Sequence, residues 1–416
     1  MSVIQAPRGT FDVLPADAAR RSALEAHAAR ILEAAGYGRI ETPAFEATDL
    51  FRRGVGEATD IVQKEMYTFD DGGGRSLTLR PEGTAPVCRA YVEHGMHKLP
   101  QPVKLWYLSS FFRAEAPQRG RYRQFWQIGA EVIGSATAES DAELILLLAE
   151  LLESFGVREP RLLLSSLGTP ETRAEYREEL AAFLRAHADS LAPEVVARIE
   201  LNPLRAFDAK DPTTQATMRS APKLLDRLTP DDAEHFQHVR DLLDDADLRY
   251  EIEPTLVRGL DYYARTVYEF TSEAIGAAQS TIGGGGRYDG LIEQIGGHPT
   301  PASGWAAGVE RILLAAPEPP IAPQSVDLFV AIATPGAARV AFDLTSEARR
   351  AGLSAQLELT GRSLKGQLKQ ADRLGARFVA LVGADPQIAL KQMDSGEQRD
   401  HDRDAVIPTI LRSSRL

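Results

Sequence analysis

The chain has 416 residues and a formal net charge of −12 at pH 7, a length that favours two or three domains rather than one. Hydrophobic residues make up 44% and charged residues 25%, and no apolar run approaches the ~20 residues that span a bilayer, which excludes a membrane protein. Because Cys88 is the only cysteine, an internal disulfide and a cysteine-rich zinc site are excluded. The first residues lack the apolar core of a secretory signal, and the two observations together favour a reducing cytoplasm.

The first 170 residues contain four segments with clear local patterns. Residues 16–35 are rich in Ala and Leu and precede Gly36, which predicts a helix that ends at a glycine. Residues 37–45 resemble a strand that Pro43 interrupts. Residues 66–79 predict a hairpin around a glycine-rich turn. Residues 140–155 are apolar on almost every side, which predicts a buried helix with Ser140 as its cap.

The middle of the chain changes character. Residues 170–246 are charged, helical in pattern and punctuated by prolines, which indicates a helical subdomain inserted between two polar motifs. A strand is expected at 266–271. The four glycines at 283–286 fit neither a dinucleotide fingerprint nor a phosphate loop. They indicate either a flexible turn or a close approach of two backbones, and the sequence does not favour one over the other.

A stretch with four prolines at 315–324 predicts a stiff linker. Strands are expected beyond it at 326–333, 353–359 and 377–383, alternating with helices at 337–351 and 363–374. This alternation predicts a small domain with a largely parallel sheet. The residues after 325 carry 13 Lys+Arg against 11 Asp+Glu. A nucleic acid would therefore have to bind local basic patches on an otherwise acidic protein.

Two polar segments carry the chemistry. The first, FRAEAPQRGRYRQFWQIGAEVIG at 112–134, contains four arginines and ends in a strand whose Gln127, Gly129 and Glu131 share one face. Such a face suits a polar pocket, because a carboxylate in the core must be paired. The second, LVRGLDYYARTVYEF at 256–270, adds Arg258, an aspartate and the adjacent tyrosines Tyr262 and Tyr263. Arginine forks match phosphate oxygens, so a nucleotide-using enzyme is indicated. A solvated hairpin and a charged edge strand are the alternatives.

These segments, together with APRGTFDVLP, GEATDIVQKEMYTF, LTLRPEGTAP, NPLRAFDAK, GGGGRYDGL, GVER and GRSLKGQLKQAD, resemble the histidyl-tRNA synthetase family of class II aminoacyl-tRNA synthetases over nearly the whole chain. The resemblance implies an α+β fold, in which a six- or seven-stranded antiparallel core carries a helical insertion and is followed by an α/β anticodon-binding domain. It places the catalytic core at 1–169 and 247–316, the insertion at 170–246, the linker at 317–325 and the anticodon-binding domain at 326–416.

The resemblance also implies an ATP-dependent ligase. Such an enzyme activates L-histidine to histidyl-adenylate, releases pyrophosphate and transfers histidine to the 3′ end of tRNA(His). Family members use Mg²⁺ on the ATP phosphates and form homodimers through an element that resembles 16–43 here. One alternative is the non-catalytic regulatory subunit of ATP phosphoribosyltransferase. Another is a class II synthetase for glycine, threonine or proline, which would not share LVRGLDYY.

The family's functional residues match specific positions of this sequence. The catalytic matches are Arg113, Arg258 and Arg311. The ATP-binding matches are Arg113, Glu115, Arg121, Phe125 and Arg311. The histidine-binding matches are Glu82, Thr84, Gln127, Glu131, Arg258, Tyr262, Tyr263 and Tyr288. Gln118 matches a residue that touches the tRNA acceptor end, and no side chains are assigned to a metal. Two positions depart from the family: Ala116 replaces a usual arginine, and Trp126 replaces a usual histidine.

Overall fold

The structure is a computed structural model that describes residues 3–57, 59–256, 259–276, 280–317 and 326–413. The chain divides into two compact units, Met1–Glu318 and Pro319–Leu416. Most of the proline-rich linker expected at 317–325 lies outside the described residues. In the described part of the chain, no helix is both long and apolar enough to cross a bilayer.

The first unit is built on an eight-stranded sheet. Its strands, in spatial order, are β1 (Gly38–Arg39), β5 (Val103–Phe112), β6 (Gln124–Ile133), β11 (Ala302–Gly308), β10 (Thr281–Arg287), β9 (Ala264–Thr271), β7 (Arg161–Ser166) and β8 (Glu251–Ile252). The six central strands are antiparallel. Two-residue strands add parallel pairs at both edges, which accounts for the difference from the six or seven antiparallel strands expected.

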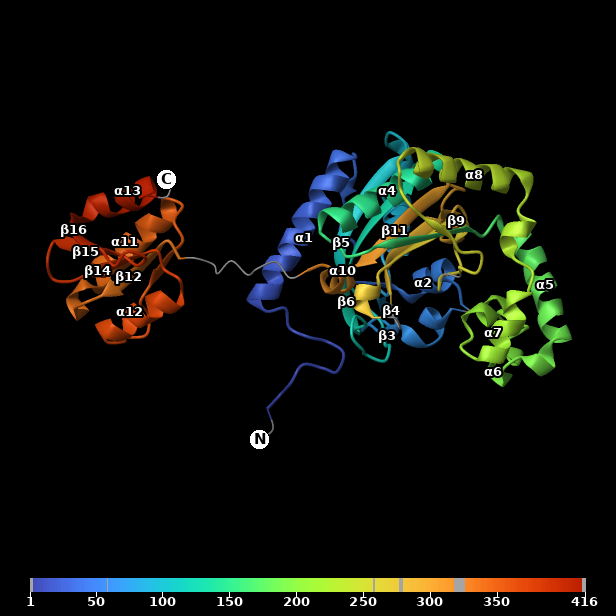
Figure 1. Ribbon diagram of the computed structural model, residues 1–416, viewed down its shortest axis with the longest axis horizontal. Helices are drawn as coiled ribbons and strands as arrows, with labels where there is room; N and C mark the ends of the chain where they lie inside the picture. The colour runs from blue at the N-terminus through green and yellow to red at the C-terminus, as the bar shows by residue number, and fades with distance from the viewer. Residues whose placement is uncertain (1–2, 58, 257–258, 277–279, 318–325, 414–416) are drawn as a thin grey trace. The chain divides into compact units, whose positions relative to one another are not determined.

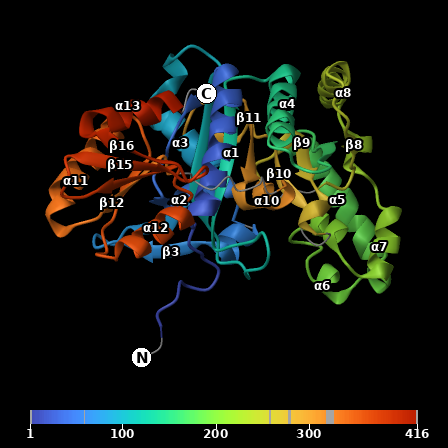
Figure 2. The same ribbon diagram turned by 60° about the vertical axis from the view of Figure 1, so that its left-hand side comes forward.

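One face of this sheet is covered by helices α1 (Pro15–Ala34), α4 (Ala138–Ser154), α8 (Pro230–Asp245) and α10 (Val309–Ala315). Helices α1 and α4 lie side by side in both views (Figures 1 and 2). The end of α1 is as predicted, because Gly36 follows it with a φ of +85°. The predicted cap of α4 is wrong: Thr137 occupies the cap, and the Ser140 hydroxyl donates to the Thr137 carbonyl from inside the first turn.

The opposite face carries α3 (Thr84–Glu93) and α9 (Leu291–Gln294). Beside it, α2 (Thr48–Val55) packs near a three-stranded sheet of β2 (Phe45–Ala47), β4 (Ser76–Leu79) and β3 (Tyr67–Asp70). The hairpin predicted at 66–79 is confirmed as β3 and β4. The interruption predicted at Pro43 within residues 37–45 is confirmed. Only β1 and the first residue of β2 are extended strand there, on either side of Pro43, whose ring removes a ladder donor.

Residues 170–245 form four α-helices, with short 3-10 helices between them: α5 (Pro170–Ala186), α6 (Pro193–Val196), α7 (Pro212–Arg219) and α8. Proline occupies the start of each α-helix, where its missing N–H is harmless. The first three helices gather at the end of the unit away from α1, whereas α8 returns to lie over α4 (Figures 1 and 2). The segment is helical, as predicted from its pattern.

The four glycines at 283–286 lie within β10, at the centre of the sheet. A Cβ on Gly285 would stand 2.0 Å from the Gly304 carbonyl oxygen of β11, and one on Gly286 would stand 2.4 Å from the Thr266 carbonyl oxygen. The run therefore serves the close approach of neighbouring backbones, and the flexible-turn alternative is wrong.

The second unit contains a five-stranded sheet in the order β13 (Ala355–Leu357), β12 (Leu328–Ile332), β14 (Phe378–Val382), β15 (Gln387–Gln392) and β16 (Gln398–Asp402). Its helices are α11 (Ala338–Arg350), α12 (Leu364–Arg373) and α13 (Arg403–Ser413). The three predicted strands are parallel, but β15 pairs antiparallel with β14, and β16 pairs antiparallel with β15. The sheet is therefore mixed rather than largely parallel, and sequence reasoning missed β15, β16 and α13.

Candidate active site

A cavity of about 320 Å³ opens on the α3 face of the large sheet. Its wall is assembled from segments far apart in the chain: the start of α3, the loop between β5 and β6, the outer half of β6, residues 259–263, strands β9 to β11 and the start of α10. Side chains alternate between the two faces of β6. Ile128, Ala130 and Val132 pack into the helical core, whereas Phe125 and Gln127 face the cavity.

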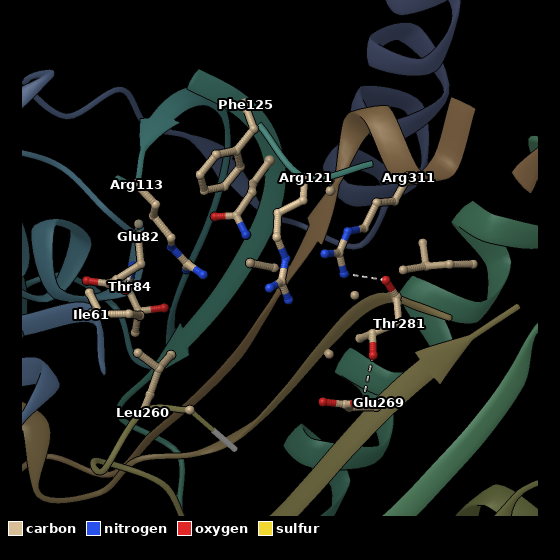
Figure 3. Close-up of a pocket in the computed structure, with 18 of the residues that line it drawn as sticks. Ile61, Glu82, Thr84, Arg113, Arg121, Phe125, Leu260, Glu269, Thr281 and Arg311 are labelled. Atoms are coloured by element: carbon tan, nitrogen blue, oxygen red, sulfur yellow. Dashed lines mark hydrogen bonds between the residues drawn. The ribbon is translucent and has the colours of Figure 1, made fainter. Parts of the chain in front are cut away.

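Three guanidinium groups line one part of the cavity. Arg113, Arg121 and Arg311 project into the same space in Figure 3. Arg113 donates through Nε to the Pro81 carbonyl at 2.9 Å. Arg311 donates to the carbonyls of Gly120 at 3.0 Å and Thr281 at 2.7 Å. These carbonyls orient both arginines without neutralising them, which leaves a field suited to an anion.

Carboxylates and an aromatic ring complete the basic part. Glu115 accepts from Arg121 Nε at 2.9 Å, and Arg113 lies 3.8 Å from the same carboxylate. The ring of Phe125 lies 5.3 Å from the Arg113 guanidinium, a cation–π arrangement. Burial, followed by the charge of Arg121, lowers the pKa of Arg311 from its ordinary value. A bound polyanion would relieve the repulsion between these arginines.

Two buried carboxyl groups mark the other part of the cavity. Glu82 lines the wall and accepts the backbone N–H groups of Thr84 at 2.7 Å and Ala85 at 3.1 Å, where α3 begins. Glu131 is completely buried behind Thr84, whose hydroxyl donates to it at 2.8 Å. The hydroxyl of Tyr288 also donates to Glu131. Burial raises the pKa of Glu82 to about 7 and that of Glu131 to about 8.

Aromatic and amide groups surround these carboxyls. Tyr262 and Tyr263 line the wall with their rings 4.7 Å apart, and Tyr288 lies behind them, 5.6 Å from Tyr262. The buried Oε1 of Gln127 accepts from no donor among the described residues. A buried amide oxygen at the wall of a cavity is well placed to accept from a ligand N–H.

The structure thus brings most of the sequence-predicted residues to one place. The wall includes ten of them: Glu82, Thr84, Arg113, Glu115, Arg121, Phe125, Gln127, Tyr262, Tyr263 and Arg311. Glu131 and Tyr288 form a second layer that reaches the wall through Thr84. Gln118 is not part of the wall and pairs with Arg121 in the loop. Arg258 lies outside the described residues.

Sequence reasoning missed several residues of this site. Glu269 and Thr281 line the cavity beside Arg311, and the Thr281 hydroxyl donates to Glu269 at 3.0 Å (Figure 3). Tyr107 fills the space above two glycines: a Cβ on Gly129 would stand 2.2 Å from its ring, and one on Gly83 would stand 2.5 Å from it. A glycine inside a strand was the available signal for Tyr107, whereas nothing local indicated Glu269.

His94 and His97 lie three positions apart, a spacing that could suit a metal. Within the described ranges, no three His, Cys, Asp or Glu side chains lie together as a metal cluster. His97 instead packs its ring edge-on against His298, with ring centroids 6.2 Å apart.

Comparison with known proteins identifies the family. Residues 9–312 match the family model for histidyl-tRNA synthetase, and residues 327–413 match the one for an anticodon-binding domain. A histidine–tRNA ligase of Thermosynechococcus vestitus is 46% identical over 401 residues, which covers 95% of this chain and 93% of that protein. The structure of apo Staphylococcus aureus histidyl-tRNA synthetase has a TM-score of 0.81 at 35% identity, over 98% of this chain and 100% of that one.

A more distant structure shares the fold. It is described as an ATP phosphoribosyltransferase regulatory subunit/histidyl-tRNA synthetase from Bacillus halodurans, and it matches with a TM-score of 0.66 at 20% identity, over 92% of this chain and 100% of that one. The full-length matches at higher identity and the family model over 9–312 lead to one conclusion. The chain belongs to the histidyl-tRNA synthetase family.

Proposed function

We propose that this chain joins L-histidine to tRNA(His) in two ATP-dependent steps that take place in the cavity described above. The observation that carries the proposal is the division of that single cavity into two parts. Arg113, Arg121 and Arg311 line one part, and the buried Glu82 and Thr84 line the other. The first part suits a triphosphate, and the second suits a small molecule rich in N–H groups.

ATP occupies the basic part in this proposal. Arg113 holds the α-phosphate, and Arg311 packs on the adenine and reaches the outer phosphate. Phe125 stacks on the other face of the adenine, so that the base lies between an aromatic ring and a guanidinium. Glu115 and Arg121 contribute further contacts to the nucleotide, and Arg258, known here only from its sequence match, is assigned to the α-phosphate.

Histidine occupies the acidic part. Its α-amino and carboxylate groups are held by Glu82, Thr84 and Gln127. The Gln127 oxygen lacks a donor among the described residues, which supports a contact with the ammonium group. Glu131 and Tyr263, with Tyr262 and Tyr288 nearby, hold the imidazole. Both imidazole nitrogens need a partner, and an apolar side chain would leave these buried groups unpaired. Such a mismatch can discriminate by ~10⁴-fold.

The first step is attack of the histidine carboxylate oxygen on the α-phosphorus of ATP. The new P–O bond forms as the bond to the β-phosphate bridging oxygen breaks, which releases pyrophosphate. In the second step the terminal ribose hydroxyl of tRNA attacks the carbonyl carbon of the adenylate, and AMP leaves. Positioning and charge neutralisation by the arginines supply most of the acceleration.

The cavity also contains groups that suit Mg²⁺. Glu115 and Glu269 both line it, and Mg²⁺ usually binds one or two carboxylates together with substrate phosphates. These two residues would hold the ion, which would offset charge on the β- and γ-phosphates. Glu269 is not among the ATP-binding residues implied by the family resemblance. It is proposed as a Mg²⁺ ligand because it lines the cavity.

The remaining assignments follow the family. The unit that contains β12 to β16 reads the anticodon, and Gln118 touches the acceptor end. The enzyme acts in the cytoplasm as a homodimer formed through the element that resembles 16–43. The insertion at 170–246 lies over the acceptor arm of the tRNA. The catalytic core comprises 1–169 and 247–316, and the linker at 317–325 joins it to the anticodon-binding domain at 326–416.

The regulatory-subunit alternative is less well supported. Such proteins share the core fold, but they need neither a complete set of nucleotide-binding arginines nor an anticodon-binding domain. Here Arg113 and Arg311 line one cavity, and residues 327–413 match an anticodon-binding domain.

Amino-acid-dependent pyrophosphate exchange tests the proposal. The purified protein is incubated with ATP, labelled pyrophosphate and each of the twenty amino acids in turn. Label should enter ATP only with histidine, and the same preparation should charge tRNA(His). Exchange with a different amino acid would refute the histidine assignment, and no exchange with any amino acid would favour the regulatory alternative.

A further inference from the structure

A polar cluster joins α1, β6 and α10 beside the cavity. Arg21 of α1 donates through Nη2 to one carboxylate oxygen of Glu310 at 2.6 Å. The other carboxylate oxygen accepts the backbone N–H of Trp126 at 3.1 Å. The Arg21 and Glu310 side chains are only 16% and 8% exposed. Both oxygens of Glu310 are therefore committed in a largely buried setting, where a charge-assisted hydrogen bond is strong.

Arg21 also makes aromatic contacts. Its guanidinium carbon lies 4.6 Å from the ring of Trp126 and 5.5 Å from that of Phe11. The neighbouring Arg20 donates to the carbonyl of Leu313 at 3.0 Å, so two adjacent arginines of α1 bind groups about one turn apart on α10. These contacts fix the start of α10 against α1 and against the strand that bears Trp126.

The neighbours of this cluster in sequence are cavity residues. Trp126 lies between Phe125 and Gln127, and Glu310, which itself lines the cavity, directly precedes Arg311. A single carboxylate thus ties the strand that carries Phe125 to the helix that carries Arg311. Those two side chains are the proposed walls of the adenine site.

We propose that Arg21 is a positioning residue for ATP. By neutralising and orienting Glu310 and stacking on Trp126, it holds Phe125 and Arg311 at the separation that the adenine needs, without contacting the nucleotide itself. The inference rests on the proposed binding of ATP in this cavity. If Arg21 were absent, the Glu310 carboxylate would be nearly buried without a cation, and the first turn of α10 would shift to solvate it.

The ring on which the Arg21 guanidinium stacks is an indole. An indole offers a wider face to a guanidinium than an imidazole does, and Arg is the cation that stacks best on such a face. The arginine on α1 and the tryptophan on β6 therefore act as one unit, and substitution of either should affect the same property.

The test compares Arg21→Ala and Arg21→Lys with Arg39→Ala. Arg39 makes the same kinds of contact elsewhere: an ion pair with Glu25 at 2.7 Å and a ring contact with Trp106 at 5.2 Å. Neither Arg39 nor its partners Glu25 and Trp106 line the cavity. For each variant, the Kd of ATP is measured by calorimetry, and the KM values of ATP and histidine are measured by pyrophosphate exchange.

Arg21→Ala should raise the Kd and KM of ATP by about tenfold, the effect of losing one charge-assisted hydrogen bond that organises a site. The KM of histidine should change by less than about twofold, because the histidine part of the cavity does not contact Arg21 or Glu310. Arg39→Ala should change none of the three constants, because Arg39 does not contact that pair. Arg21→Lys keeps the charge but loses the planar stack, so it should give an intermediate value. If Arg21→Ala fails to fold, Arg21→Lys decides by the ratio of the two KM values.

Equal changes in the KM of ATP and of histidine would mean that Arg21 has only a structural role, and an unchanged ATP affinity would overturn the inference as well. A wild-type protein that binds ATP but shows no exchange would refute the proposed ligase, while the Kd values would still decide the role of Arg21. A wild-type protein that binds no ATP would overturn both.

Discussion

The burial of the Glu131 carboxyl should make the first unit less stable as the pH rises. This carboxyl is completely buried, and burial raises its pKa from 4.5 to about 8. Between these two values the folded protein retains a proton that the unfolded chain has released. Because stability falls with pH wherever the folded state binds more protons, the contribution of Glu131 is fully present below about pH 4.5 and is lost as the pH rises through about 8.

The size of this effect follows from the same numbers. A rise in pKa from 4.5 to about 8 corresponds to about 5 kcal/mol, at ~1.36 kcal/mol for each pH unit. Glu131→Gln should remove this dependence, since the amide has nearly the same shape and carries no titrating proton. Glu82 adds a smaller dependence of the same sign, because burial raises its pKa to about 7. That part should remain in the variant.

The assay is denaturant unfolding at intervals from pH 5 to pH 9, with Glu175→Gln as the control because Glu175 is exposed on α5. The free energy of unfolding of Glu131→Gln, relative to wild type, should increase with pH and level off above about pH 8, at up to about 5 kcal/mol. Infrared difference spectra should show the protonated carboxyl band of Glu131 disappearing over the same range. Stability curves that run parallel for wild type and variant would refute the reasoning.

Three further outcomes are expected. Gly129→Ala would place a Cβ 2.2 Å from a neighbouring tyrosine ring and should lower the free energy of unfolding by about 1–3 kcal/mol, whereas Gly72→Ala meets nothing within 4 Å and should be nearly neutral. Asp232→Ala removes a buried carboxylate that accepts the Thr169 N–H and pairs with Arg265. The midpoint of thermal unfolding should therefore fall by an amount equivalent to about 3–5 kcal/mol. Glu179→Ala breaks an exposed ion pair with Arg227 and should cost less than about 1 kcal/mol. Cys88 is buried and burial raises its thiol pKa, so mass spectrometry should find it alkylated only as fast as the protein opens, and rapid native labelling would contradict that.

The polar face of β6 was predictable because its signal is local. Gln127, Gly129 and Glu131 recur at every second residue, and strand geometry alone places them on one side. The structure puts Gln127 on the cavity wall and buries Glu131 behind it. Which partners would satisfy Glu131 was not local: Thr84 is 47 positions away and Tyr288 is 157 positions away.

Other elements could not be read from the chain because their neighbours define them. Strand β16 has the sequence QRDHD and is largely exposed, so it lacks the apolar alternation that indicates a strand. It is extended because it pairs with β15. The glycines at 283–286 are a similar case, since their role depends on β11 and β9 lying on either side. Likewise, the pairing of Arg21 with Glu310 spans 289 positions.

The glycines and the buried carboxyl belong to one physical arrangement. A Cβ on Gly304 would lie 1.6 Å from a carboxylate oxygen of Glu131, so the neighbouring strand has room for this acid only because it carries no side chain there. The space thus created holds a group whose burial is unfavourable above neutral pH. A ligand that supplied an N–H to this carboxyl would recover part of that free energy, whereas an apolar ligand of the same size would not. The loss of stability at high pH and the proposed selectivity for histidine would then have the same origin. Glu131→Gln should therefore make the protein more stable at high pH and less selective for histidine.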